Sequence, residues 1–182
     1  METFSDKELI AQFSEQGKKE IAFTRIMRKY QEKLYWHVRR IVVSHEDADD
    51  VIQNTFMKVW NNLEAFRGNA QLFTWLFRIA TNEALSFLKQ RKRNTFMPWK
   101  DYENYLEENL ESNVFFSGDA IRKKLQKALI RLPEKQRLVF NMKYFEEMKY
   151  EDMAEILGTS VGALKASYHH AVKKIEYYLS ED

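Results

Sequence analysis

Apolar residues recur at helical spacing along most of this chain, and few residues interrupt the pattern. Among 182 residues there are only five Gly and two Pro. Gly and Pro mark turns, and strands need shorter and more often interrupted runs. One long segment, 18–43, repeats an apolar residue mostly every three or four positions: Phe23, Ile26, Met27, Tyr30, Leu34, Val38 and Ile41. The sequence therefore predicts an all-α protein.

The uneven distribution of charge predicts how the chain is divided. Residues 1–93 carry 16 Lys and Arg against 12 Asp and Glu, residues 94–119 carry 1 against 6, and residues 120–182 carry 12 against 9. Helical periodicity fades in the acidic segment, which Pro98 interrupts. We expect two small helical domains, 1–93 and 120–182, joined by a flexible acidic linker at 94–119. This linker is either a solvated spacer or a mimic of the polyanion in a nucleic-acid channel.

Several kinds of site are excluded by composition. The chain has no Cys and only four scattered His, so we expect neither a metal nor a cofactor. The adjacent His169 and His170 would diverge on a helix with no third ligand nearby. The sequence also lacks a basic-then-apolar leader and an apolar run of about 18 residues, so we expect no membrane insertion and a cytoplasmic location.

A third helix is predicted to begin after Ser44, whose pairing with Asp47 resembles a capping box. Its first turn is densely acidic, which suits the positive end of a helix dipole. Helical spacing separates an apolar inner face from a polar outer face, and the candidate docking residues there are Asp49, Asp50, Gln53, Asn54 and Met57. The outer face is either a solvated surface or a docking surface for a basic partner helix, and spacing leaves both open.

The next loop and helix form a second candidate site. The loop, 61–71, contains Arg67, Gly68, Asn69 and Gln71. The helix that follows, 72–93, has a polar stripe opposite its packed side. This stripe begins with an aromatic residue and ends with basic residues: Trp75, Arg78, Asn82, Ser86, Lys89 and Arg93. An aromatic plane supports an unstacked base by about 1 to 3 kcal/mol, and cations follow the phosphate backbone, so the stripe favours single-stranded DNA. Alternatively, Trp75 is a core anchor. The basic end also complements the helix dipole, which is compatible with phosphate contact.

The last helices have the pattern of a helix-turn-helix. Helices are expected at 121–131 and 134–144, and then at 150–157 and about 160–179, the last two joined by a turn that contains Gly158. In such a motif the second helix lies in the major groove of DNA. The candidate DNA-contacting residues on its exposed face are Ser160, Lys165, Ser167, His169, His170 and Lys173.

Three blocks of sequence carry a resemblance to a known family. They read DADDVIQNTFMKVWNNLEAFRG, FTWLFRIATNEA and LPEKQRLVFNMKYFEEMKYEDMAEILGTSVGALK. In order and spacing they resemble the extracytoplasmic-function (ECF) sigma factors, compact members of the bacterial sigma-70 family. The resemblance covers nearly the whole chain.

The resemblance implies a set of partners and roles. Residues 1–93 would bind core RNA polymerase at the β′ clamp helices through Asp49, Asp50, Gln53, Asn54 and Met57. They would recognise and melt the minus-ten promoter element through Arg67, Asn69, Gln71, Trp75, Arg78, Asn82, Lys89 and Arg93. Residues 120–182 would read the minus-thirty-five element and contact the β flap. An anti-sigma factor would restrain the protein.

Base flipping supplies a physical reason for these roles. Opening the duplex costs a few kcal/mol for each flipped base, so a pocket that holds the base is required. Asn69 and Gln71 can hydrogen-bond a base edge, while Arg78 and Lys89 can hold phosphates. The chain needs no catalytic group for this task, and it has no clustered carboxylates to hold the metals of phosphodiester synthesis.

Some positions depart from the family pattern. The last helix has Ala163, Ala166, Ser167 and His170 where the family commonly has hydroxyl and Arg side chains. Loss of an Arg–guanine contact typically costs about 1 to 3 kcal/mol of discrimination, so we expect minus-thirty-five recognition to be weak, unusual or dependent on Lys165, Lys173 and Lys174. Ser86 stands where Asp is usual.

Two other functions are compatible with parts of the sequence. A helix-turn-helix transcriptional regulator that does not bind core polymerase would explain residues 134–179 but leave 46–93 without a role. A small nuclease would need a metal or an acid–base cluster, whereas the acids of this chain lie in a helix first turn or in the linker. We therefore expect no enzyme.

Overall fold

The computed structural model of the chain describes residues 4–95, 104 and 120–181, and these contain helices and no strand. The all-α prediction is therefore confirmed, while the predicted linker lies almost entirely outside the described residues. The helices are α1 (Asp6–Phe13), α2 (Lys19–Val42), α3 (His45–Asn62), α4 (Leu72–Thr95), α6 (Ala120–Ile130), α7 (Glu134–Tyr144), α8 (Tyr150–Leu157) and α9 (Val161–Glu181), with a short 3₁₀ helix, η1 (Leu63–Ala65), after α3.

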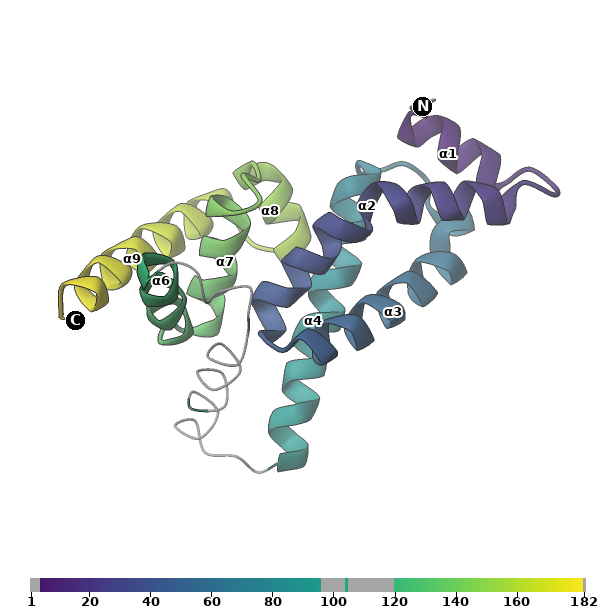
Figure 1. Cartoon of the computed structure of the whole chain (residues 1–182). Coiled ribbons are helices and arrows are strands. Elements are labelled where there is room, and N and C mark those ends of the chain that lie inside the picture. Colours follow the sequence, from purple (N-terminus) through teal and green to yellow (C-terminus); the bar gives the residue numbers. More distant parts are fainter. Residues whose placement is uncertain (1–3, 96–103, 105–119, 182) are drawn as a thin grey trace.

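Helices α1 to α4 pack around α2, which contacts each of the other three (Figure 1). The predicted apolar face of α2 supplies the centre of this core, because Ile26, Leu34 and Val38 have no exposed surface. From α4, Leu76 and Phe77 meet it and are equally buried. Periodicity thus predicted the packed side of α2 correctly.

Helix ends differ from the expected ones by a few residues. The sequence also predicts a short first helix that is capped by Ser5 and ended by Gly17, at about Gln16. The observed helix α1 ends at Phe13, and α4 continues two residues beyond 93, to Thr95. The expected capping box at the start of α3 is only half formed. The Ser44 hydroxyl accepts from the Asp47 N–H, but the Asp47 carboxylate pairs with Arg91 of α4. This pair fastens the start of α3 to the end of α4.

The turn from α2 to α3 has a strained backbone. Val43 has φ 67° and ψ −35°, and the N–H of Ser44 donates to the carbonyl of Val42 at 2.9 Å. This geometry is close to a γ-turn of the rare, strained type, which a β-branched residue adopts reluctantly. Val43 is nevertheless 5% exposed, so burial of its side chain holds the turn and sets the direction of α3.

Helices α6 to α9 form a second packed group. Both α6 and α7 contact α9, and α8 also packs on it. A separate buried cluster joins α6, α7 and α9, with Phe140 of α7 stacked against Tyr168 of α9 at a centroid distance of 5.7 Å. In α9, Ala171 and Ile175 are buried as the sequence predicts.

The two helical groups are in direct contact. Helix α8 packs on α4, and α7 approaches α2, as Figure 1 shows. The main buried cluster runs continuously from α2, α3 and α4 into α7 and α8, where it includes Met142, Met153 and Ile156. We call this packing of α7 and α8 on α2 and α4 the closed arrangement. Nothing in the sequence pattern predicted it.

Candidate functional site

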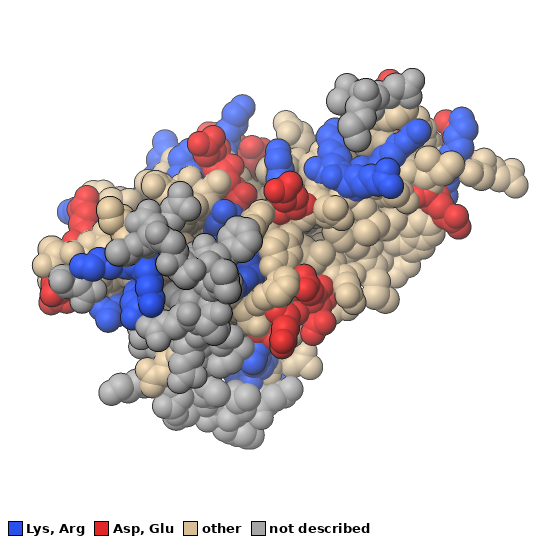
Figure 2. Space-filling view, viewed as in Figure 1, with Lys and Arg blue, Asp and Glu red and all other residues tan. Residues whose placement is uncertain are grey.

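The outer face of α3 is exposed along its whole length. Every predicted docking residue on it is exposed: Asp49, Asp50, Gln53, Asn54 and Met57. Met57 has 64% of its surface exposed and places an apolar side chain among these polar ones. Acidic side chains gather where α3 begins (Figure 2). The face therefore combines negative charge with an apolar contact.

The inner face of α3 holds that surface in place. Val51 and Val59 are buried, and the buried Thr55 hydroxyl donates back to the Val51 carbonyl at 2.7 Å. At the first turn, His45 lies 2.6 Å from the Tyr35 hydroxyl through Nδ1 and 3.6 Å from Asp49 through Nε2. The outer face is thus presented by a helix that is fixed along its length.

The loop before α4 is anchored at one end by aromatic packing. The Phe66 ring lies 5.0 Å from the Trp75 ring, and both side chains are half-buried. Beyond Phe66, the predicted contacts Arg67, Asn69 and Gln71 are exposed. Gly68 between them has φ 71°, a conformation that other residues adopt at a cost of about 1 kcal/mol or more. The loop therefore presents its polar side chains from a defined turn.

On α4 the predicted polar residues share one side of the helix. We call this set the α4 stripe: Trp75, Arg78, Asn82, Ser86, Lys89 and Arg93. Trp75 serves the core in part, since it packs against the buried cluster as well as against Phe66. Asn82, Ser86, Lys89 and Arg93 are exposed.

Arg78 is already occupied by the second helical group. Its guanidinium donates to the Glu155 carbonyl at 2.9 Å and to the Glu155 carboxylate at 3.0 Å. The first of these bonds satisfies a carbonyl in the last turn of α8, where helical carbonyls have no partner within the helix. Arg78 therefore caps α8 in the closed arrangement.

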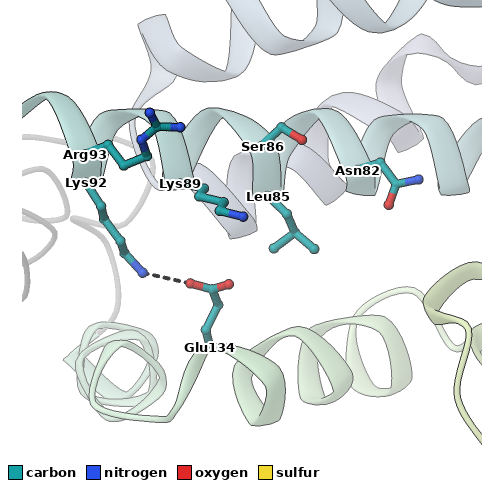
Figure 3. Close-up of a pocket in the computed structure, with 7 residues that line it drawn as sticks. All are labelled: Asn82, Leu85, Ser86, Lys89, Lys92, Arg93 and Glu134. Carbon is teal, nitrogen blue, oxygen red and sulfur yellow. Dashed lines mark hydrogen bonds and ion pairs between the residues drawn. The ribbon is translucent and has the colours of Figure 1, made fainter.

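The other end of the α4 stripe lines a cleft between α4 and the start of α7. The cleft has a volume of about 550 Å³ and is lined by Asn82, Leu85, Ser86, Lys89, Lys92, Arg93 and Glu134. Figure 3 shows Lys92 reaching across it to Glu134, and their charged groups are 2.8 Å apart. Of the basic residues near this end of α4, Arg91 pairs with Asp47 and Lys92 with Glu134, whereas Lys89 and Arg93 are exposed.

The predicted helix-turn-helix is formed by α8 and α9. Gly158 ends α8 in the left-handed conformation, and the Ser160 hydroxyl accepts from the Ala163 N–H at the start of α9. Five of the predicted contacts on this motif are exposed and Ser167 is half-buried; the exposed ones are Ser160, Lys165, His169, His170 and Lys173. The motif thus exposes polar side chains along α9, with Ala166 exposed among them.

Two further features concern metal binding and membrane crossing. The described residues contain no group of three His, Asp or Glu side chains that could hold a metal ion. None of the helices in the described part of the chain is both long enough and apolar enough to cross a membrane.

Sequence reasoning missed three residues of this region. The role of Phe66 could have been predicted, because a single aromatic residue in a polar loop often anchors the loop. The sequence does not indicate the roles of Glu134 and Glu155. Acidic residues are common in the first and last turns of short helices, and the partners of these two lie far away in sequence, on α4.

Two family models match separate parts of the chain. Residues 26–94 match the family described as Sigma-70 region 2, and residues 122–175 match Sigma-70, region 4. The ECF RNA polymerase sigma-E factor of Haemophilus influenzae is 30% identical to the chain, over 96% of the chain and 95% of that protein. The ECF RNA polymerase sigma factor SigW of Bacillus subtilis is 28% identical, over 88% and 90%.

Solved structures give the same result. The sigma factor RpoE of Bartonella quintana, solved with the anti-sigma factor NepR, has a TM-score of 0.68 and 25% identity over 88% of this chain and 98% of its own. CnrH, solved with the cytosolic domain of CnrY, has a TM-score of 0.70 over 97% and 98%, and its 24% identity supports the shared fold alone. The chain therefore belongs to the sigma-70 family, as an extracytoplasmic-function sigma factor of RNA polymerase.

Proposed function

We propose that the outer face of α3 binds the β′ clamp helices of core RNA polymerase. The observation that carries this assignment is the exposed set of acidic and amide side chains beside an exposed Met57, on a helix whose opposite face is buried. Charged rims attract a partner of opposite sign, and methionine adapts its shape to an apolar contact. A face with these side chains is better suited to bind a basic partner helix than to serve only as a solvated surface.

We propose that the loop and the α4 stripe capture and melt the minus-ten element. Asn69 and Gln71 are exposed on the loop and can hydrogen-bond the edge of a flipped base. Trp75 has a part-exposed ring near the loop, and Lys89 and Arg93 are exposed further along α4. A strand following the stripe would meet a stacking surface first and cations afterwards.

Replacing Asn69 with Ala tests base capture by the loop. We expect open-complex formation to fall about 10-fold, because one hydrogen-bonding contact to a base contributes about 1 to 3 kcal/mol, while binding to closed duplex changes little. Permanganate reactivity of unpaired thymines measures opening, and a mobility-shift assay measures duplex binding. Gln31→Ala on α2 removes an exposed amide elsewhere and serves as the control. An equal loss in both assays would count against base capture.

For the C-terminal half, we propose that α9 reads the minus-thirty-five element and that this half contacts the β flap. Support for the first role comes from the exposed polar face of α9 and the Ser160 cap at its start. The exposed part of this face is rich in Lys and His and includes Ala166, so bidentate Arg–guanine contacts are absent there. Recognition would then depend strongly on phosphate contacts, among them those of Lys165 and Lys173, and would be sensitive to salt.

We also propose that the chain works in the cytoplasm and has an anti-sigma factor of its own. Two similar folds were solved in complex with such a factor or with a cytosolic partner domain, which motivates the second proposal. The chain itself is assigned no catalytic step, since phosphodiester synthesis belongs to the polymerase.

Copurification tests the function as a whole. The purified chain is mixed with bacterial core RNA polymerase, and transcription from genomic fragments is compared with and without it. Co-elution with core together with new, discrete start sites is the expected result. If the chain bound duplex DNA specifically but did not bind core, the regulator function would replace the sigma function, and residues 46–93 would lose their assigned role.

A further inference from the structure

We propose that His45 is a positioning residue for core binding, which holds the Asp49 carboxylate of the outer face of α3 in the orientation that meets the polymerase. The inference rests on the proposed role of that face and deepens it. His45 is the first residue of α3, and its ring lies between Tyr35 on α2 and Asp49, one turn further along α3. The imidazole thus connects the docking face to the helix behind it.

The strained turn before α3 brings His45 to this place. Val43 has a positive φ of 67°, which a β-branched residue adopts only at a cost. Val43 and Ser44 are 5% and 9% exposed, so burial holds the turn, and the Ser44 hydroxyl caps the first turn of α3. Strain of this kind persists only where the surrounding structure compensates for it, and it is common at functional sites. Here it sets His45 against Tyr35.

Tyr35 fixes the orientation of the imidazole. Its hydroxyl lies 2.6 Å from Nδ1 of His45. The Arg39 guanidinium also hydrogen-bonds the Tyr35 oxygen, and because a guanidinium can only donate, the hydroxyl proton is left for His45. Burial raises the pKa of Tyr35, with Arg39 partly opposing the shift, so the hydroxyl keeps this proton at neutral pH. Nδ1 of His45 therefore accepts, and the neutral ring carries its proton on Nε2.

The Nε2–H side of the ring faces the docking surface. Nε2 lies 3.6 Å from the Asp49 carboxylate, which is an electrostatic contact rather than a hydrogen bond. Within the described ranges, no other side chain forms an ion pair with Asp49. The N–H dipole attracts the carboxylate, whereas the ring has a net charge only when both nitrogens are protonated. A neutral imidazole thus orients Asp49 and leaves its negative charge for a basic partner.

Orientation before binding matters because these side chains are largely surrounded by solvent. The side chain of Asp49 is 53% exposed and that of His45 is 67% exposed. A side chain that is already ordered loses less conformational freedom in a complex, so its contact contributes more to affinity. Exposed pairs of this kind are individually weak. The expected effect of His45 on core binding is therefore a change of a few fold.

A double-mutant cycle between positions 45 and 49 tests the inference. His45→Phe keeps an aromatic ring and removes both ring nitrogens. Affinity of the full chain for core RNA polymerase is measured by fluorescence titration at about pH 8, where imidazole groups are mostly neutral. We expect His45→Phe to weaken binding about 3- to 5-fold in the wild type, and less than about 1.5-fold when Asp49→Asn is already present. Equal losses in the two backgrounds would overturn the inference, because His45 would then act without Asp49.

A conservative replacement separates positioning from a purely structural role. Glutamine four residues before an aspartate on a helix can hydrogen-bond its side chain, so His45→Gln should retain core affinity within about 2-fold of the wild type. Gln31→Phe adds an aromatic ring at another exposed position, on α2, and is expected to bind as the wild type does. A His45→Gln variant that bound as weakly as His45→Phe would contradict the proposal.

A second cycle examines the hydroxyl behind the ring. Tyr35→Phe removes the donor to Nδ1 and is expected to weaken core binding about 2-fold, with no further loss when His45→Phe is already present. Circular dichroism of each variant checks that the helical content is unchanged, so that a loss of affinity reports on the surface. Independent losses from the two substitutions would show that Tyr35 does not act through His45.

The Asp49→Asn variant separates this inference from the function on which it rests. If Asp49→Asn weakens core binding and His45→Phe does not, only the positioning role of His45 is refuted. If the wild type does not bind core, or if Asp49→Asn binds core with wild-type affinity, the proposed docking role of Asp49 is refuted and the inference falls with it.

Discussion

Replacing Asp50 and Asn54 together with Lys is expected to lower the affinity of the chain for core RNA polymerase about 100-fold or more. Both side chains are exposed on the outer face of α3. If that face meets a basic helix, the substitutions create like-charge contacts across the interface, which cost several kcal/mol, and each 1.4 kcal/mol changes affinity tenfold. The exposed positions have no role in the core, so the folded structure should persist.

A charge-matched variant gives this experiment its control. Glu32→Lys with Gln31→Lys changes the net charge by the same amount at exposed positions of α2. Affinity for core is measured by fluorescence titration, and helical content by circular dichroism. We expect the α2 variant to retain core binding and both variants to keep their helical content. If the α3 variant bound core with wild-type affinity, the outer face of α3 would not be the core-binding surface.

Acidification is expected to destabilise the fold through His37. This side chain is 1% exposed, and its Nε2 lies 2.8 Å from the Thr81 hydroxyl. The Thr81 hydroxyl donates its proton to the Phe77 carbonyl, so it accepts from His37, which fixes the neutral Nε2–H tautomer. The buried Nδ1 has no partner, and a proton there would find no acceptor among the described atoms. Burial, with a smaller contribution from Arg40, lowers the pKa of His37 to about 3.

The sign of the pH dependence follows from this shift. Because the folded-state pKa lies below the unfolded value of 6.5, the unfolded chain binds the proton first. The contribution of His37 to stability is complete above pH 6.5 and is lost progressively as the pH falls toward about 3. In that window the free energy of unfolding should decrease by up to about 1.4 kcal/mol per pH unit.

Urea unfolding at a series of pH values tests the role of His37. His37→Leu introduces an apolar side chain of similar size and removes the titrating group, so the free energy of unfolding of this variant should depend less steeply on pH between 6 and 4. Phe77→Leu disturbs the ring that packs on His37, at 5.0 Å, without removing a titratable group, and should keep the wild-type slope. An unchanged slope in His37→Leu would show that other groups cause the acid sensitivity.

Local signals in the sequence determined the helices and the faces that they expose. The αL conformation of Gly158, the Ser160 cap and the outer face of α3 were all predictable, because capping and helical periodicity involve residues within about four positions of one another. The predicted ends of the helices were less accurate than the predicted faces. Helices fray at their ends, and α1 and α4 end at Phe13 and Thr95, within a few residues of the predicted positions.

Tertiary structure decided which of these faces are available. Arg78 and Glu155 are 77 residues apart in sequence, and Arg40 and Glu146 are 106 apart, so no local pattern indicates either pair. The strained turn at Val43 is equally invisible, since only burial in the assembled core compensates for a backbone that Val disfavours. The sequence by itself determined the helices, the family and the candidate surfaces. Only packing between distant segments decided that the outer face of α3 is open and that Arg78 of the α4 stripe is paired with Glu155.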